Sequence, residues 1–386
     1  MTQVSYKLLV NDVPASEDLL RAVRQIEVEE SAEMADMLRL QLAIAVRSDG
    51  GGWTLVDNGT FRRLTRLHLM VAVGNSPMES LIDAYVIETN VTFSDRPGQS
   101  TLNVVAMEPT VLMDLQEKAR EWSDMADSDI AQAIFREYGF ESDVDPTTIV
   151  RRQSERTVMQ RSKDIQFLRE LARRNNFECY VETDPRRHVN VGHFHRPRVD
   201  DRPQGVLSVN TGPETNVSSF SVRNDLLGPT TAKASAVDIE TGTDPSSVIE
   251  RPELAALGLE STVLSSLVEE LLPGTPGPDW SRRVLLSQTG LTEAAEVQAH
   301  AQAVVDRSSW SITASGEVHT ATFGRILRAK RPVLVRGLGP RFSGAYYVER
   351  VSHTISSGGY TQAFSLKRNA LGASRRDDFS RVLQES

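Results

Sequence analysis

The chain has 386 residues, a length that suits about two or three domains, and its 39% hydrophobic and 25% charged residues are typical of folded proteins rather than disordered or fibrous ones. Its formal net charge of -9 at pH 7, without a basic run, argues against a nucleic-acid partner. Because Cys179 is the single cysteine and no signal-peptide pattern or membrane-length apolar stretch occurs, we expect maturation in a cytoplasm and no direct membrane insertion.

Residues 1–108 carry a repeated strand pattern. Short runs rich in Val, Leu, Ile and Thr alternate with turn signals; the runs are VRQIEVEE, MLRLQLAIAV, LTRLHLMVAV, AYVIETNVTF and STLNVVAM. The turns include Gly50-Gly51-Gly52 and Arg96-Pro97-Gly98. This pattern predicts a first tube-like antiparallel β-barrel over residues 1–108.

The period changes at Pro109, and residues 109–216 read as an α+β middle domain. VLMDLQEKA and DIAQAIFREYG are expected helices, and the clearest helix follows Ser162, with the apolar stripe Ile165, Leu168, Leu171 and Ala172. Asn175 and Asn176 should end it. The strands FECYVE and HVNVGHF come next, so we predict helices packed on a small sheet.

From Val217 the strand pattern returns and predicts a second tube-like β-barrel over residues 217–372. Its expected strands are VSSFSVRN, TAKASAVDIE, SWSITASG, RPVLVRG, AYYVERVSHTI and YTQAFSLKRN. A Pro-rich loop and one helix, capped by Thr292, interrupt it at about 242–310, and 373–386 form a charged tail. The expected fold class is mainly β with an α+β middle region: two antiparallel barrels and a helix-on-sheet domain.

An internal repeat connects the two β regions. Ala84-Tyr85-Val86-Ile87-Glu88, a turn and Thr101–Val105 match Ala345-Tyr346-Tyr347-Val348-Glu349, a turn and Thr361–Ser365. Two interpretations stay open, a true domain repeat or a chance likeness of two hairpins. Three copies of a duplicated chain would present six similar barrels, so a trimer could contact an assembly with sixfold symmetry.

Two segments resemble a known family. Val158–Ala172, followed by Phe177–Val181, resembles the signature of the phage late-control protein D family, which also occurs in the hub half of the type VI secretion spike protein, VgrG. The segment Phe342–Val348, with Val351-Ser352-His353 and Gly359-Tyr360-Thr361 after it, is similar to the ending typical of that family. The resemblance spans nearly the whole chain and is weakest across Gly242–Gly290.

The resemblance implies a structural baseplate hub of a contractile injection system. Such hubs are homotrimers whose two barrels per chain form a pseudo-hexameric ring between the hexameric inner tube and the trimeric central spike. The Gly- and Val-rich needle repeats of spike-fused relatives are missing here, so the implied spike is a separate protein. We expect other baseplate proteins as further partners, assembly in a bacterial cytoplasm, and a final place in a virion or tail-like particle.

Sites for metals and nucleophiles find little support in the sequence. His193 and His195 point to one face of an expected strand, and Asp200 and Asp201 could add oxygen ligands, but a solvated polar edge is the favoured interpretation. Cys179 lies in an apolar strand and is expected to be a small core residue. We therefore predict no metal, no cofactor and no cofactor-binding residue.

The alternative function is a baseplate-associated peptidoglycan hydrolase. Its carboxylates could come from Glu29-Glu30, Glu269-Glu270 or Asp377-Asp378, but sequence neighbours point apart, whereas glycoside hydrolysis needs two carboxylates facing one cleft. Gly50-Gly51-Gly52 lacks the residues of a phosphate loop, and no Gly-x-Ser-x-Gly elbow occurs. We expect no catalytic residues and no enzyme.

Overall fold

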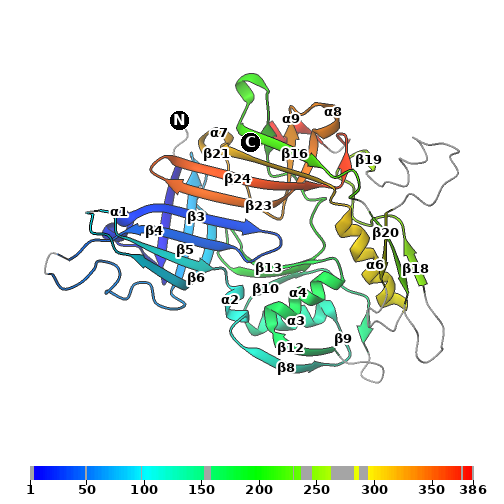
Figure 1. Cartoon of the computed structure of the whole chain (residues 1–386), viewed down its shortest axis with the longest axis horizontal. Coiled ribbons are helices and arrows are strands. Elements are labelled where there is room, and N and C mark those ends of the chain that lie inside the picture. The colour runs from blue at the N-terminus through cyan, green and yellow to red at the C-terminus, as the bar shows by residue number, and fades with distance from the viewer. Residues whose placement is uncertain are drawn as a thin grey trace.

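The computed structural model describes residues 4–47, 50–96, 98–151, 158–228, 230–235, 246–261, 282–286, 294–374 and 377–384 (Figure 1). The predominant elements are β-strands, and 13 strands form one large sheet. The fold is mainly β with large antiparallel pairings, as the sequence predicts, and its helices gather in the middle region and beside the large sheet.

The first half of the large sheet, called the first half-sheet, comes from the N-terminal region. Its strands are β1 (Val4–Val10), β2 (Val13–Pro14), β3 (Val23–Ser31), β4 (Met37–Ala43), β5 (Arg66–Val73), β6 (Glu79–Thr92) and β7 (Thr101–Met107), with helix α1 (Glu17–Ala22) before β3. On β4 the residues Leu38, Leu40 and Leu42 are at most 1% exposed, and the residues between them face outward. This alternation gives the half-sheet one core face and one solvated face.

The second half-sheet comes from the C-terminal region and has its own core. Its strands are β15 (Val206–Ser208), β16 (Val217–Asn224), β21 (Ile312–His319), β22 (Pro332–Arg336), β23 (Gly344–Ser356) and β24 (Gly359–Arg368). Short elements around it are η1 (Gly212–Glu214), α7 (Thr320–Phe323), α8 (Gly339–Phe342), α9 (Phe379–Gln384) and the pair β19 (Glu260–Ser261) and β25 (Ala370–Leu371). Tyr346, Val348 and Leu366 lie fully buried in this core.

The two half-sheets have the same strand order. The strands of the first half-sheet lie in the order β3-β4-β7-β6-β5-β1, and those of the second lie in the order β16-β21-β24-β23-β22-β15. Numbering these six strands of each half along the chain gives the same spatial order, 2-3-6-5-4-1, in both. One difference is that β1 pairs antiparallel with β5, whereas β15 pairs parallel with β22. The halves join where β3 pairs antiparallel with β23, so the sheet is continuous.

Two β-bulges are also duplicated. They lie between Val86 and Glu88 on β6, between Val348 and Arg350 on β23, between Val23 and Gln25 on β3, and between Val217 and Ser219 on β16. A bulge shifts the register by one residue, so shared bulges are specific markers of related strands. They match Tyr85 to Tyr347, one residue away from the match made by sequence.

The middle region packs two helices on one face of a small sheet (Figure 1). The sheet has the order β10 (Glu141–Val144), β14 (Asn190–His195), β13 (Glu178–Thr183), and the helices are α3 (Asp127–Glu137) and α4 (Asp164–Arg174). Smaller pairings join β8 (Glu117–Trp122) to β12 (Val158–Lys163) and β9 (Met125–Ala126) to β11 (Val150–Arg151). As predicted, α4 buries Ile165, Leu168 and Leu171 and ends at Asn175.

Some elements differ from the sequence expectation. The first expected helix shortens to α2 (Thr110–Met113), and its remainder becomes β8, because pairing with β12 and the burial of Trp122 outweigh helix propensity. Strand β15 belongs to the second half-sheet although it precedes Val217. Strand β17 (Thr231–Ser235), expected in the second barrel, instead pairs with β18 (Ser246–Ile249) and β20 (Arg283–Leu286).

The reason for the position of β17 is the helix beside it. Helix α6 (Ala294–Ser308) packs Val297, Ala301 and Val305 against Ala232 and Ala234 of β17, where small side chains let the helix approach closely. The expected cap Thr292 and most of 242–290 lie outside the described residues. The domain boundaries proposed from the sequence stay a prediction.

Candidate functional site

A cluster of charges joins the two half-sheets and the middle region. It contains three cations from the segment before β22 and three carboxylates from elsewhere: Arg328, Lys330 and Arg331 with Glu30, Asp36 and Glu182. The Nε atom of Arg328 lies 3.1 Å from Oε1 of Glu30. Lys330 Nζ donates to both oxygens of Asp36 at 2.7 and 3.0 Å, and Arg331 Nη2 donates to Glu182 Oε1 at 2.7 Å. Charges of both signs balance at this junction.

The charged residues of this junction are buried, so their geometry is restricted. Glu30, Arg328 and Lys330 are 4%, 7% and 4% exposed. Burial alone raises the pKa of Glu30, but the Arg328 guanidinium and the nearby His353 ring more than offset it and lower the pKa to about 2. Because a buried charge that loses its partner is strongly destabilising, these ion pairs hold the two half-sheets and the middle region in one relative position.

The middle region contacts the second half-sheet through one face of β13. Glu178, Tyr180 and Glu182 alternate along this strand and face away from helices α3 and α4, whose side the core residues Cys179 and Val181 occupy. Tyr347 donates its hydroxyl to Glu178 Oε2 at 2.6 Å, and Lys330 Nζ lies 4.6 Å from the ring centroid of Tyr180. These contacts fix the middle region against the large sheet.

The solvated side of the large sheet, called the polar face, runs across both half-sheets. Its residues alternate with core residues and include Gln25, Glu27, Glu29, Arg39, Gln41, Asn103, Ser315, Glu317, Arg350, Ser352, Thr354, Ala363 and Ser365. Arg39 lies 3.5 Å from Glu29, and Arg350 lies 3.3 Å from the same carboxylate across the β3–β23 junction. The polar face therefore continues where the half-sheets meet.

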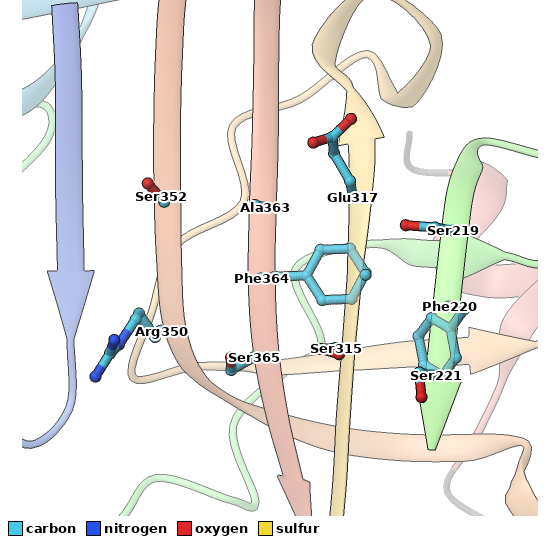
Figure 2. A pocket seen from close by; sticks show the side chains of 11 residues that line it. Ser219, Phe220, Ser221, Ser315, Glu317, Arg350, Ser352, Ala363, Phe364 and Ser365 are labelled. Atoms are coloured by element: carbon cyan, nitrogen blue, oxygen red, sulfur yellow. The ribbon is translucent and has the colours of Figure 1, made fainter. Parts of the chain in front are cut away.

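A shallow depression of about 500 Å³ lies on this face, over β16, β21, β23 and β24. Figure 2 shows the side chains that line it. Serines predominate in its lining, with the rings of Phe220 and Phe364 and the charges of Glu317 and Arg350. Among the described residues that line it, Glu317 is the one carboxylate, whereas glycoside hydrolysis needs a facing pair.

The structure brings His193 and His195 together with a residue that the sequence did not indicate. Both lie on β14, and Asp143 on β10 is the register partner of His193. The three side chains form the group of possible metal ligands in the described part of the chain, and neither Asp200 nor Asp201 belongs to it. Because β10 and β14 pair in parallel from distant parts of the chain, sequence spacing gives no signal for this contact.

Cys179 and the pair Glu29-Glu30 take the positions expected from the sequence. Cys179 is 8% exposed in the middle core, where burial raises the pKa of its thiol to about 12, so it is an unreactive core residue. Glu29 points to the polar face and Glu30 to the buried junction, so the two carboxylates face apart. Asp377 accepts from the Ser374 N–H, and Glu269-Glu270 lies outside the described residues.

The sequence comparisons give limited information. A family model described as the Alg8 N-terminal domain matches residues 21–209, slightly less than half of the chain, so it does not place the chain in that family. No curated protein sequence matches. Within the described residues, no helix has the length and apolar character needed to cross a membrane.

Solved structures share the fold over nearly the whole chain. The 43 kDa tail protein of prophage MuSo2 from Shewanella oneidensis is 13% identical with a TM-score of 0.63, covering 96% of this chain and 100% of that one. A tail protein from Neisseria meningitidis is 10% identical with a TM-score of 0.63, covering 95% and 97%.

A third structure comes from the type VI secretion system of E. coli. This component, described as structurally similar to the T4 bacteriophage tail proteins gp27 and gp5, is 11% identical with a TM-score of 0.56, covering 96% of this chain and 77% of that one. At these identities the likeness shows that the chain has the fold of these tail proteins.

Proposed function

We propose that this chain is the central hub of a contractile, phage-tail-like injection baseplate. It acts as a homotrimer that adapts a hexameric inner tube to a trimeric central spike. The observation that carries this proposal is the duplicated half-sheet, with one strand order and two bulges repeated and with the two copies joined in a single sheet.

Symmetry explains the use of such a duplication. A tube ring of six subunits offers six equivalent contacts, and a trimer can meet all six when each chain carries two similar surfaces. The buried charges at Glu30 and Arg328 keep the two half-sheets in one fixed relation, which a ring requires. The middle region has no duplicate, and neither does helix α6 with the strands β17, β18 and β20, so both lie outside this ring.

The polar face suits the wall of the ring's channel. On the second half-sheet most of its side chains are small and hydroxylated, with the charges of Glu317 and Arg350 among them, and on the first it carries charges of both signs. Such a surface stays hydrated and offers no large apolar patch to a passing protein. We therefore place the polar face toward the axis and the half-sheet cores away from it.

The shared fold supports the same function. Two of the similar structures are named as tail proteins, and the third as a component of the type VI secretion system. We infer membership of the late-control protein D group, partnership with inner-tube, spike and other baseplate proteins, and a role in assembly without catalysis. The finished particle is the location in which the chain acts.

Light scattering coupled to size-exclusion chromatography tests the oligomer directly. We expect a mass three times that of the 42.7 kDa chain, for the purified protein or for its complex with a coexpressed tube or spike protein. A stable dimer or hexamer under both conditions contradicts the proposal.

A further inference from the structure

Among the strand edges of the large sheet that have no strand beside them in the described part of the chain, one lies on β16 and another on β6. β16 is the last strand on one side of the sheet. β6 pairs with β5 only as far as Tyr85, so the edge of Glu88–Thr92 that faces away from β7 is open. Open edges expose unpaired N–H and C=O groups, which favour pairing with another chain.

The duplication shows which strands inside the chain are equivalent to β16 and β6. The shared bulges make β16 the equivalent of β3, with Ser219 matching Gln25. They also make β6 the equivalent of β23, with Glu88 matching Arg350. Inside the chain, β3 pairs with β23. Their equivalents, β16 and β6, do not pair with each other in the described part of the chain, so each keeps an open edge.

The register follows from the internal pairing. Within the chain, Ser352 pairs with Glu29, His353 with Val28, Thr354 with Glu27 and Ile355 with Ile26. Replacing each residue by its equivalent gives the pairs Asn90–Arg223, Val91–Val222, Thr92–Ser221 and Phe93–Phe220. Polar residues meet polar ones and apolar residues meet apolar ones at every step, as a paired strand with one buried face requires.

Exposure at these positions agrees with a missing neighbour. Phe93 is 58% exposed, and its ring lies 4.9 Å from that of Trp53. Phe220 is half-buried at the rim of the depression in Figure 2. An aromatic side chain that loses its remaining exposure on pairing contributes to the stability of an interface.

The charges match as well, with their signs exchanged. Inside the chain, Arg350 lies 3.3 Å from Glu29 across the β3–β23 junction. Their equivalents are Glu88 and Arg223, and within the described residues neither side chain has an ion-pair partner. Opposite charges on facing edges favour the same register that the apolar pairs favour.

We propose that β16 of one chain pairs antiparallel with Glu88–Phe93 of a second copy. This inference rests on the proposed trimeric hub and names its contact. The contact is head-to-tail and repeats the internal relation between the half-sheets, so three copies close a ring of six half-sheets. The sheet then has no open edge at these two strands.

A pair of cysteines tests the register. Val91→Cys with Val222→Cys places two thiols opposite each other in neighbouring chains, at a distance that a disulfide spans. Oxidation should give covalent dimers and trimers on a non-reducing gel. Each single variant, and the mismatched pair of Val91→Cys with Arg186→Cys in the middle region, should give none. Cys179 stays silent because it is buried.

The outcomes separate this inference from the proposed function. A protein that is trimeric by light scattering but does not crosslink through this pair disproves the strand contact and leaves the hub function standing. A protein that is not trimeric with either tube or spike partner disproves the function itself. Charge variants give a second measurement: Glu88→Arg or Arg223→Glu should weaken the trimer, and the two together should restore it.

A second, independent observation concerns Asp143, His193 and His195. The His193 Nδ1 atom lies 3.3 Å from Asp143 Oδ2 and 3.3 Å from His195 Nε2, and that Nε2 lies 3.7 Å from Asp143 Oδ2. Tetrahedral zinc with bonds of about 2.0–2.1 Å places its ligand atoms about 3.3–3.4 Å apart. The three atoms therefore have close to the spacing of one face of a zinc tetrahedron.

The protonation of His195 also suits a ligand. Its Nδ1 atom lies 2.8 Å from the carbonyl oxygen of Arg196, and because a carbonyl only accepts, Nδ1 carries the proton and Nε2 keeps its lone pair. Arg198 Nη2 lies 3.2 Å from Asp143 Oδ1, which orients the carboxylate and leaves Oδ2 toward the histidines. Asp143 is about half exposed, so an ion can enter from that side.

We propose that these three side chains bind Zn²⁺ or a similar transition-metal ion, with water as a fourth ligand, and so clamp β10 to β14. Protein stripped with chelator and titrated with zinc chloride should bind one ion per chain and unfold at a higher temperature. Asp143→Asn, at a half-exposed position, should lower the affinity by about tenfold or more. His319→Ala, a control at an exposed histidine, should change neither. No binding by the wild-type protein, or equal binding by Asp143→Asn, disproves the site.

Discussion

Glu30 Oε1 and Arg328 Nε lie 3.1 Å apart in the protein interior, although they come from opposite halves of the chain. Glu30 belongs to β3 and Arg328 to the segment before β22, and Ala329 N–H donates to the other oxygen of Glu30 at 2.9 Å. Arg328 also donates to the backbone oxygen of Ser80 on β6 at 3.0 Å. This contact links the duplicated half-sheets at their core rather than only at their shared edge.

Removing one partner of this pair should be costly. Arg328→Met leaves the buried Glu30 charge without its main partner, so we expect a loss of about 3–5 kcal/mol in the free energy of unfolding. Chemical denaturation measures it. Arg350→Ala removes the exposed ion pair with Glu29 and, as a control, should cost less than about 1 kcal/mol. A cost for Arg328→Met no greater than that of the control contradicts the structural role.

Glu108 should make stability depend on pH. Burial, with the nearby Asp36, raises the pKa of Glu108 to about 7 in the folded protein, well above its ordinary value of 4.5. The folded state therefore holds a proton that the unfolded state has lost, and stability should fall as the pH rises from about 4.5 to about 7.

Glu108→Gln isolates this effect because it keeps the shape and removes the charge. The variant should lack this part of the fall and should be more stable than the wild-type protein at pH 8. Thermal unfolding across this pH range measures both curves. Parallel curves for the two proteins would show that Glu108 does not titrate in this window.

Gly316 should be required for the edge strand of the ring. A Cβ atom at this position would lie 2.4 Å from the Ser219 carbonyl oxygen and 2.7 Å from Phe364 Cζ. Gly316→Ala should therefore push β16 away from β21, cost about 1–3 kcal/mol, and reduce trimer formation. Gly358→Ala, whose Cβ would meet Ser356 Oγ at an ordinary 3.6 Å, is the matched control and should change neither property.

Incubation with peptidoglycan tests the absence of catalysis. We expect no release of muropeptides, because Glu29 and Glu30 face apart and the depression on the polar face has one lining carboxylate among the described residues. Reproducible release that a single Asp or Glu substitution abolishes would favour the peptidoglycan hydrolase instead.

The sequence predicted the features that depend on local patterns. Alternating residues such as Leu38, Leu40 and Leu42 mark strands with one core face, and the stripe from Ile165 to Ala172 marks α4. The repeat was visible as a similar succession of strands. The sequence match of Thr101–Val105 to Thr361–Ser365 agrees with the pairing register, whereas on β6 and β23 residue similarity paired Tyr85 with Tyr346, one residue away from the match that the bulges give.

Features that depend on distant contacts could not be predicted in the same way. The basic residues Arg328, Lys330 and Arg331 resemble a solvated run until Glu30, Asp36 and Glu182 are brought to them by the fold. Asp143 meets His193 only through the parallel pairing of β10 and β14. The position of β17 depends on the helix that covers it.

The most direct test of the hub function is a reconstruction of the assembled particle at a resolution that separates strands. The account predicts three copies of the chain, with first and second half-sheets alternating around one channel, the polar face toward the axis, and β16 beside Glu88–Phe93 of the neighbouring copy. Two or six copies, or half-sheets that do not alternate around a common channel, would contradict it.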